Sequence, residues 1–169
     1  TISVTAHSDD GALDQTKSYC YRGGIKDFVL SLNEDKTPVY PEPVYVEKKT
    51  AECQVMLAFQ HTATFMENIY SFVNNIQTSE GGTHETGFKA ALTKVLNDFG
   101  RTKNLIKDKQ GSYQGEDYRE GMTAVLAVKM HDVQFEGQTK TRLGNPEAKK
   151  MVEDAVTETL REALSKAKK

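Results

Sequence analysis

Cysteine and histidine are too scarce and too scattered in this chain to suggest a metal site or a disulfide framework. The 169 residues include two cysteines, Cys20 and Cys53, and four histidines with no helical i, i+4 pair and no neighbouring cysteine. We therefore expect no metal site. Both cysteines fall in apolar, strand-like runs, where a free cysteine is usually a small buried hydrophobic residue.

Strong net charge and long apolar runs are also absent. A formal net charge of −2 excludes a basic face over the whole molecule, so any contact with nucleic acid must come from local clusters of Lys and Arg. No run approaches the roughly 20 apolar residues of a membrane span, and no signal segment opens the chain. We expect no membrane partner and a cytoplasmic location. Because Thr1 is not an initiator methionine, we expect the chain to be cut from a longer protein.

The composition, 37% hydrophobic and 27% charged, is typical of a soluble globular protein, and the length suits one domain. Period-2 alternation predicts the clearest strand in the run 51–62, where Cys53, Val55, Leu57 and Phe59 alternate with more polar neighbours. A turn at Thr50-Ala51 pairs this run with 44–49. Further strands are predicted at 18–22, 67–78 and 122–130, and residues 1–17 are expected to form a flexible or hairpin lead-in.

Three segments have helical spacing. They are 25–32, which Asn33 ends; 83–99, with Thr83 as N-cap and Gly100 as the end; and a long helix from Pro146, with Asn145 as N-cap. A short helical turn is expected at 115–120. The order of elements predicts an α+β domain, a mixed, largely antiparallel sheet with helices on one face.

The long connection Val133–Asn145 is the first candidate site. A compact domain usually joins a strand to a helix with a handful of residues, and longer loops often carry function. Gly137 allows a close backbone approach, Gln138 supplies both a donor and an acceptor, and Lys140 supplies a flexible point charge suited to phosphate. The residues alone leave two interpretations open, a phosphate-contacting finger or an ordinary surface loop.

The second candidate is the basic segment from Lys89 onward, which has a local charge of +3. Between Thr83 and Gln110 six basic residues stand against three acidic ones: Lys89, Lys94, Arg101, Lys103, Lys107 and Lys109 against Glu85, Asp98 and Asp108. Such a surface suits a polyanion, and it is equally typical of a solvated helix face. We interpret the carboxylates Glu116, Asp117 and Glu120 as groups that cap or solvate a helical turn, and no GxxxxGK[ST] or GxGxxG motif is present.

Four runs together resemble one protein family. GGIKDFVLSLN, ENIYSFVNNIQTSEGGTHETGFKAALTKVLNDF, GEDYREGMTAVLAVK and VQFEGQTKTRLGN resemble, in order and spacing, the B subunits of bacterial DNA gyrase and topoisomerase IV. The similarity covers Ser18 to about Leu164 and is to the transducer domain, which follows the ATP-binding domain. TKTRLGN and NIYSFVNNI are more like gyrase, whereas LNEDK and the tyrosine of GEDYREG are more like topoisomerase IV.

The resemblance implies a fold and partners. We expect residues 1–169 to be a transducer domain with the ribosomal-protein-S5-like fold and a left-handed βαβ crossover between Asn68 and Lys129. An ATP-binding domain is expected upstream of Thr1 and a cleavage domain downstream of Lys169. The full enzyme would use ATP and Mg²⁺, neither bound by this fragment alone, and would assemble with gyrase A, a second copy of gyrase B and double-stranded DNA.

The resemblance also implies site residues. Gln138 and Lys140 are expected to contact the γ-phosphate of ATP, with Gly137 and Thr139 supporting the loop. In the isolated domain we expect nothing to hold residues 134–143. The basic residues expected to line a DNA channel are Lys89, Lys94, Arg101 and Lys103. The alternatives are topoisomerase IV, a non-enzymatic S5-like nucleic-acid-binding module, and a mismatch-repair or chaperone ATPase of the same superfamily.

Overall fold

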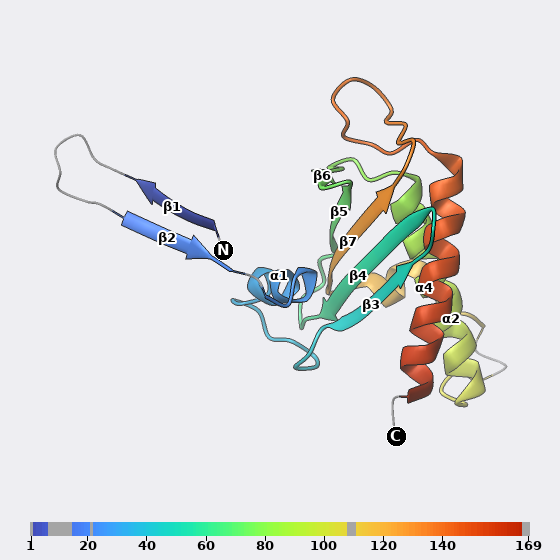
Figure 1. The fold of residues 1–169 in the computed structure, drawn as a ribbon. Coiled ribbons are helices and arrows are strands. Elements are labelled where there is room, and N and C mark those ends of the chain that lie inside the picture. The colour runs from blue at the N-terminus through green and yellow to red at the C-terminus, as the bar shows by residue number, and fades with distance from the viewer. Residues whose placement is uncertain (1, 7–14, 21, 108–110, 167–169) are drawn as a thin grey trace.

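A five-stranded mixed sheet forms the centre of the molecule (Figure 1). The computed structural model describes residues 2–6, 15–20, 22–107 and 111–166. The strands lie in the order β3-β4-β7-β5-β6. Only the β5–β7 pair is parallel within this sheet of described residues, and the other three pairs are antiparallel. The bounds are β3 Val44–Lys49, β4 Cys53–His61, β5 Asn68–Val73, β6 Ile76–Gln77 and β7 Met122–Met130.

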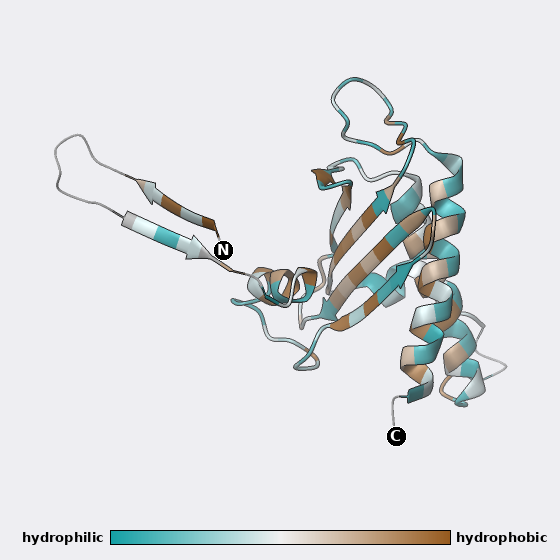
Figure 2. Cartoon of the chain, viewed as in Figure 1, coloured by the Kyte–Doolittle hydropathy of each residue, from teal (hydrophilic) through white to brown (hydrophobic). Residues whose placement is uncertain are grey.

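Alternation along the strands separates the two faces of the sheet. Leu57 in β4 and Leu126 in β7 belong to the main core, whereas their neighbours Ala58 and Val125 belong to a smaller cluster on the other face. β7 is almost entirely buried, as expected for a central strand, and Figure 2 shows the apolar bands of β4 and β7 side by side. The predicted hairpin of 44–49 with 51–62 and the predicted strand 122–130 are confirmed.

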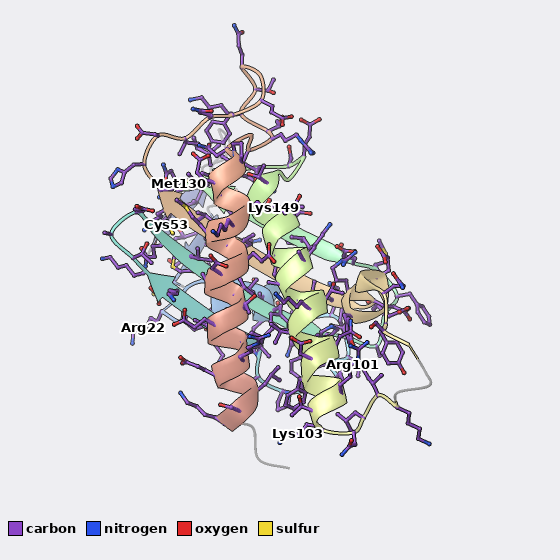
Figure 3. All side chains as sticks on the ribbon, turned by 90° about the vertical axis from the view of Figure 1, so that its right-hand side faces the viewer. Arg22, Cys53, Arg101, Lys103, Met130 and Lys149 are labelled. Carbon is purple, nitrogen blue, oxygen red and sulfur yellow. The ribbon has the colours of Figure 1, made fainter. Side chains whose placement is uncertain are left out.

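The two long helices lie on one face. Figure 3 shows α2 (Thr83–Thr102) and α4 (Pro146–Lys166) next to each other in front of the sheet. The short helix α1 (Ile25–Leu32) packs on the opposite face through Val29 and its neighbours. The prediction of a mixed α+β sheet with helices on one face is therefore confirmed for the long helices, and α1 adds a partial third layer.

The parallel pair β5–β7 is joined through α2. Both strands point upward in Figure 1, β7 lies to the right of β5, and α2 lies behind the sheet, so the crossover is left-handed. This hand is uncommon, because most βαβ connections are right-handed. The short helix α3 (Gly115–Arg119) precedes β7 and is the predicted helical turn.

Three local predictions are wrong. Residues 67–78 are a hairpin of β5 and β6 instead of one strand, because Asn74 and Asn75 both adopt positive φ, 49° and 67°, as a two-residue turn requires. Gly100 does not end α2; it lies inside the helix, where an added Cβ would come within 2.6 Å of Ile106. Thr83 is not the N-cap: Gly82 holds that position, and the Leu143 carbonyl accepts the Thr83 N–H instead.

The first strands stand apart from this sheet. β1 (Ile2–Ala6) pairs antiparallel with β2 (Gln15–Tyr19) as a separate two-stranded sheet, and the connection 7–14 lies outside the described residues. β2 thus ends before most of the predicted strand 18–22. Cys20 is exposed, contrary to the expectation of burial, whereas Cys53 is buried as expected. Within the described ranges no helix is long and apolar enough to cross a membrane.

His84 makes stability depend on pH. It is completely buried in the first turn of α2, and its Nε2 lies 3.1 Å from the Thr78 hydroxyl. Burial lowers the pKa of His84 from 6.5 to about 4. Between these values the unfolded chain binds a proton that the folded chain excludes, so stability is retained above about pH 6.5 and falls as the pH falls toward 4.

We predict that His84 alone accounts for a loss of about 3 kcal/mol in unfolding free energy between pH 7 and pH 4. Urea unfolding at both pH values, compared between the parent and His84→Gln, measures this contribution. The difference between the two pH values should shrink in His84→Gln and stay the same in His131→Gln, a change at an exposed histidine. Equal pH dependence in parent and His84→Gln would contradict the assignment.

Candidate functional site

The connection between β7 and α4 presents its polar residues at an exposed tip. Gly137, Gln138, Thr139 and Lys140 are all exposed. Gly137 and Lys140 both adopt positive φ, 79° and 56°, which makes the turn tight. Among the described residues no hydrogen bond or ion pair engages the side chains of Gln138 and Lys140, so their donors point into solvent.

The base of this loop is built as a short ladder. The Glu136 N–H donates to the Arg142 carbonyl at 2.9 Å, and the Gly144 N–H donates to the Gln134 carbonyl at 2.8 Å. An ion pair of 3.1 Å between Arg142 and Glu136 ties the two limbs together. The base of the loop is therefore held by these contacts, whereas its tip, residues 137–140, is exposed.

The returning limb of the loop also lies on the start of α2. The Leu143 N–H donates to the Gly81 carbonyl at 3.1 Å, and the Leu143 carbonyl accepts the Thr83 N–H at 3.1 Å. Leu143 is completely buried in the main core. The expectation that nothing holds residues 134–143 is therefore wrong, because both limbs form hydrogen bonds within the domain.

Gly82 makes this approach possible. Its φ of 141° lies in a region that other residues rarely adopt, and an added Cβ would lie 2.5 Å from the Leu143 carbonyl oxygen. The sequence shows the glycine pair but gives no sign of its partner. The loop contact was missed because a contact between residues 82 and 143 leaves no local pattern.

Asn145 lies at the base of the loop, where the chain enters α4. It stands directly before Pro146, the first residue of α4, as predicted. Its side chain, completely buried, accepts the Gln134 N–H at 2.6 Å and donates to the Asp132 carbonyl at 3.0 Å. From its position before α4, the Asn145 side chain therefore anchors the outgoing limb of the loop.

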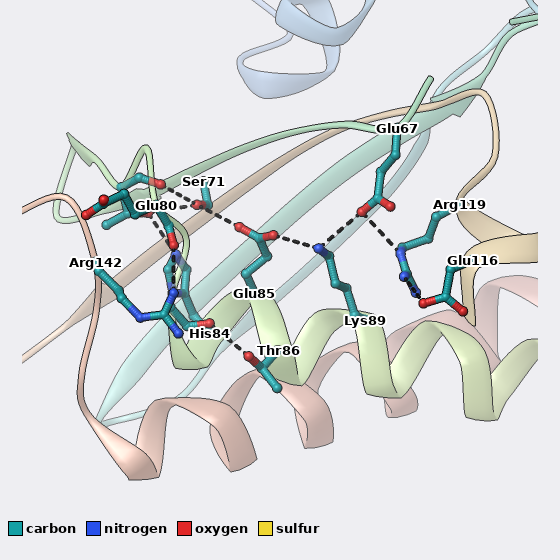
Figure 4. Close-up of polar contacts among 12 residues, drawn as sticks. Glu67, Ser71, Glu80, His84, Glu85, Thr86, Lys89, Glu116, Arg119 and Arg142 are labelled. Carbon is teal, nitrogen blue, oxygen red and sulfur yellow. Dashed lines mark hydrogen bonds and ion pairs between the residues drawn. The ribbon is translucent and has the colours of Figure 1, made fainter. Parts of the chain in front are cut away.

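The four basic residues proposed from the sequence do not share one surface. Lys89 is half-buried and forms ion pairs with Glu85 at 2.9 Å and with Glu67 at 3.2 Å (Figure 4). Glu67 also binds Arg119, which is 8% exposed and reaches Glu116 at 3.2 Å. Burial alone would lower the pKa of Lys89, but the hydrogen bonds and charges of Glu85 and Glu67 outweigh it and raise the pKa.

Lys94 and Arg101 lie on another side of α2, and Lys103 follows the end of the helix. Lys94 is exposed on α2, and at about 100° per residue it lies roughly 140° around the helix from Lys89. Arg101 donates to the Ser112 hydroxyl, and the Lys103 ammonium lies 5.8 Å from the centre of the Phe99 ring. Lys94 and Arg101 lie on the same outer side of α2, so these two residues can contact DNA together. That contact stays a prediction.

The carboxylates near α3 serve the helix. Asp117 accepts the Gln114 N–H at 2.7 Å in a capping box, and Glu116 pairs with Arg119. The interpretation of Asp117 as a capping residue is confirmed, whereas Glu116 forms an ion pair with Arg119. Among the described residues no group of three or more His, Cys, Asp or Glu side chains could hold a metal ion.

Comparison with known proteins identifies close relatives. The family model for DNA gyrase B matches residues 24–169. The DNA gyrase B protein of Bacillus mycoides is 49% identical over 150 residues, 89% of this chain and 37% of the relative. That of Streptococcus pneumoniae is 47% identical over 163 residues, 96% of this chain and 25% of the relative. The chain thus spans about a quarter to well under half of the curated relatives it matches.

Solved structures agree with this family. The 43K ATPase domain of Thermus thermophilus gyrase B, in complex with an aminocoumarin, superposes with a TM-score of 0.82 at 32% identity, covering 96% of this chain and 43% of that chain. The topoisomerase IV ATP-binding domain of Francisella tularensis has a TM-score of 0.72 at 21% identity, covering 98% of this chain and 44% of that chain, and shows likeness of fold alone.

The ion-pair chain around Lys89 yields a stability prediction. Lys89→Glu would place a carboxylate against Glu85 and Glu67, and because the site is half-exposed, solvent screening keeps the cost to about 1–2 kcal/mol of unfolding free energy. The matched reversal Lys94→Glu, at an exposed position of the same helix, should change stability by less than about 0.5 kcal/mol. Urea unfolding measures both, and equal losses would show that the network does not stabilise α2.

Proposed function

Because the chain belongs to the DNA gyrase B family, we propose that it is a transducer domain that couples ATP binding and hydrolysis in an adjacent domain to DNA strand passage. In this proposal Gln138 and Lys140 contact the γ-phosphate of ATP. Gly137 allows the tight turn that precedes them, and Thr139 supports the tip through its 3.1 Å contact with the Thr141 hydroxyl.

The observation that carries the proposal is the combination of a held base and a free tip. The Lys140 ammonium offers charge and three donors, the Gln138 amide offers two more, and none is used within the described part of the chain. Because the base of the loop is already held by hydrogen bonds, little further ordering of the loop backbone is needed when Lys140 binds an anion. These donors suit phosphate oxygens.

The fit of the cofactors differs between ATP and Mg²⁺. The donors of Gln138 and Lys140 suit the terminal phosphate of ATP, whose transfer to water supplies the free energy for the coupled step. The described residues hold no ligand cluster suited to Mg²⁺, so in this proposal the ion and the base that activates water belong to the adjacent domain. The chain alone is not proposed to hydrolyse ATP.

The wider proposal concerns partners. A cleavage domain of the same chain, gyrase A, a second copy of gyrase B and double-stranded DNA are the partners of this family role, and supercoiling is the proposed outcome. The same domain in topoisomerase IV, acting in decatenation, is the alternative, and the likeness to the Francisella domain supports it at the level of fold. A non-enzymatic S5-like nucleic-acid-binding module is less favoured, because it has no use for the exposed Gln138–Lys140 tip.

We predict that Lys140→Ala in the full-length protein slows ATP hydrolysis by roughly two to three decades, about 3 kcal/mol, because it removes a charge that stabilises the transition state. Steady-state ATPase measurements test this, with Lys150→Ala, an exposed lysine of α4, as control. Thermal unfolding of the isolated chain should be unchanged by Lys140→Ala. A variant that hydrolyses ATP at the parental rate would refute the proposed contact.

We predict that the chain binds duplex DNA weakly, without sequence preference, and with an affinity that falls steeply between about 50 mM and 200 mM salt. The double reversal Lys94→Glu, Arg101→Glu should weaken this binding further, since both residues share the outer side of α2. Fluorescence anisotropy with a labelled duplex measures the effect, with Lys150→Glu as control. Binding unaffected by salt or by the double reversal would exclude this surface.

A further inference from the structure

Glu80 uses three separate groups to hold the two residues that follow Lys140. Its N–H donates to the Thr141 carbonyl at 2.9 Å, and its carbonyl accepts the Arg142 guanidinium at 3.0 Å. Its carboxylate accepts the Thr141 hydroxyl. We propose that Glu80 is a positioning residue that fixes where Lys140 stands, an inference that rests on the proposed contact of Lys140 with phosphate.

The contacts act directly on the tip. Thr141 is bonded to Lys140 along the chain, and its hydroxyl also lies 3.1 Å from the Thr139 hydroxyl. Glu80 therefore holds Thr141, the residue after Lys140, by both backbone and side chain. Thr141 in turn contacts Thr139, the residue before Lys140. The positive φ of Lys140, 56°, needs such support, because this conformation is costly for a residue with a Cβ.

Arg142 extends the hold across the loop. Its guanidinium bridges the Glu80 carbonyl, on the segment before α2, and the Glu136 carboxylate, on the outgoing limb. The returning limb therefore lies between two supports. The Arg142 guanidinium forms an ion pair with Glu136 and a hydrogen bond with the Glu80 carbonyl. Within the described loop, Lys140 is therefore the cation without a partner.

Glu80 is itself fixed to the sheet. The Gly81 N–H donates to the Thr78 carbonyl at 2.9 Å, and the Thr78 N–H donates to the Ser71 carbonyl of β5 at 2.8 Å. The Thr78 and Ser71 hydroxyls are 2.7 Å apart in a buried contact. The segment that carries Glu80 is thus connected to β5 by a continuous series of hydrogen bonds and peptide bonds.

The test is a double-mutant cycle on ATP hydrolysis in the full-length protein. Glu80→Ala keeps both backbone contacts and removes the one hydrogen bond from the Thr141 hydroxyl to the carboxylate, so it should lower kcat by about three- to tenfold, with little change in ADP affinity. In a Lys140→Ala background the same change should alter kcat by less than about twofold, because the group being positioned is gone. A merely structural role for Glu80 would give equal factors in both backgrounds.

Conservative variants separate positioning from folding. Glu80→Gln keeps a carbonyl acceptor for the Thr141 hydroxyl and should restore most of the rate, and Thr141→Ser should do the same where Thr141→Val does not. Glu52→Ala, at an exposed carboxylate of the β3–β4 turn, is the matched control. If thermal unfolding shows that Glu80→Ala destabilises the chain, Thr141→Val carries the cycle.

The outcomes distinguish the two proposals. Lys140→Ala at the parental rate overturns both the phosphate contact and the positioning role. A slow Lys140→Ala together with Glu80→Ala and Thr141→Val at the parental rate overturns the positioning role alone. If Lys140→Ala is slow and Glu80→Ala has equal effects in both backgrounds, the positioning role is also overturned. An effect of Glu80→Ala that is seen only when Lys140 is present supports the positioning role.

Discussion

Leu143 is completely buried, and both of its backbone groups bond to the segment that starts α2. This contact fixes the returning limb of the loop, supplies the acceptor for the Thr83 N–H, and leaves no room for any residue but glycine at position 82. A side chain such as Thr83 is not needed as a cap, because the loop itself caps the helix. The loop and α2 therefore form one structural unit, and the exposed tip has a defined place on the domain.

The topology explains why these distant segments meet. β5 and β7 are parallel neighbours, so both end at the same edge of the sheet. The segment after β5 turns into α2 at that edge, and the segment after β7 leaves it as the loop (Figure 1). The left-handed crossover thus places the first turn of α2 beside a loop about sixty residues further along the chain. A phosphate bound at the tip would therefore be connected to α2 through the loop and, through Thr78 and Ser71, to the sheet.

Much of the fold could be predicted from periodicity, and less of the site. Alternation located β4, a continuous apolar run located β7, and Pro146 located the start of α4, because these signals are local. The Asn74-Asn75 turn was missed because apolar residues on both sides resemble one continuous strand. Lys89 was assigned to a DNA surface because Glu67, one of its two ion-pair partners, is distant in sequence. Glu80 gave no signal, since its three contacts exist only once the two segments meet.

Hydrogen exchange of backbone amides in the chain tests most directly whether the loop is built onto α2. If Leu143 is held as described, its N–H and that of Thr83 should exchange slowly, with protection close to that of the buried strand β7, because both are bonded and lie at the edge of the core. The N–H groups of Gln138 to Lys140 at the exposed tip should exchange at rates near those of an unstructured peptide. Exchange at Leu143 and Thr83 as fast as at Lys140 would contradict the account, since it would mean that the loop lies free of the helix.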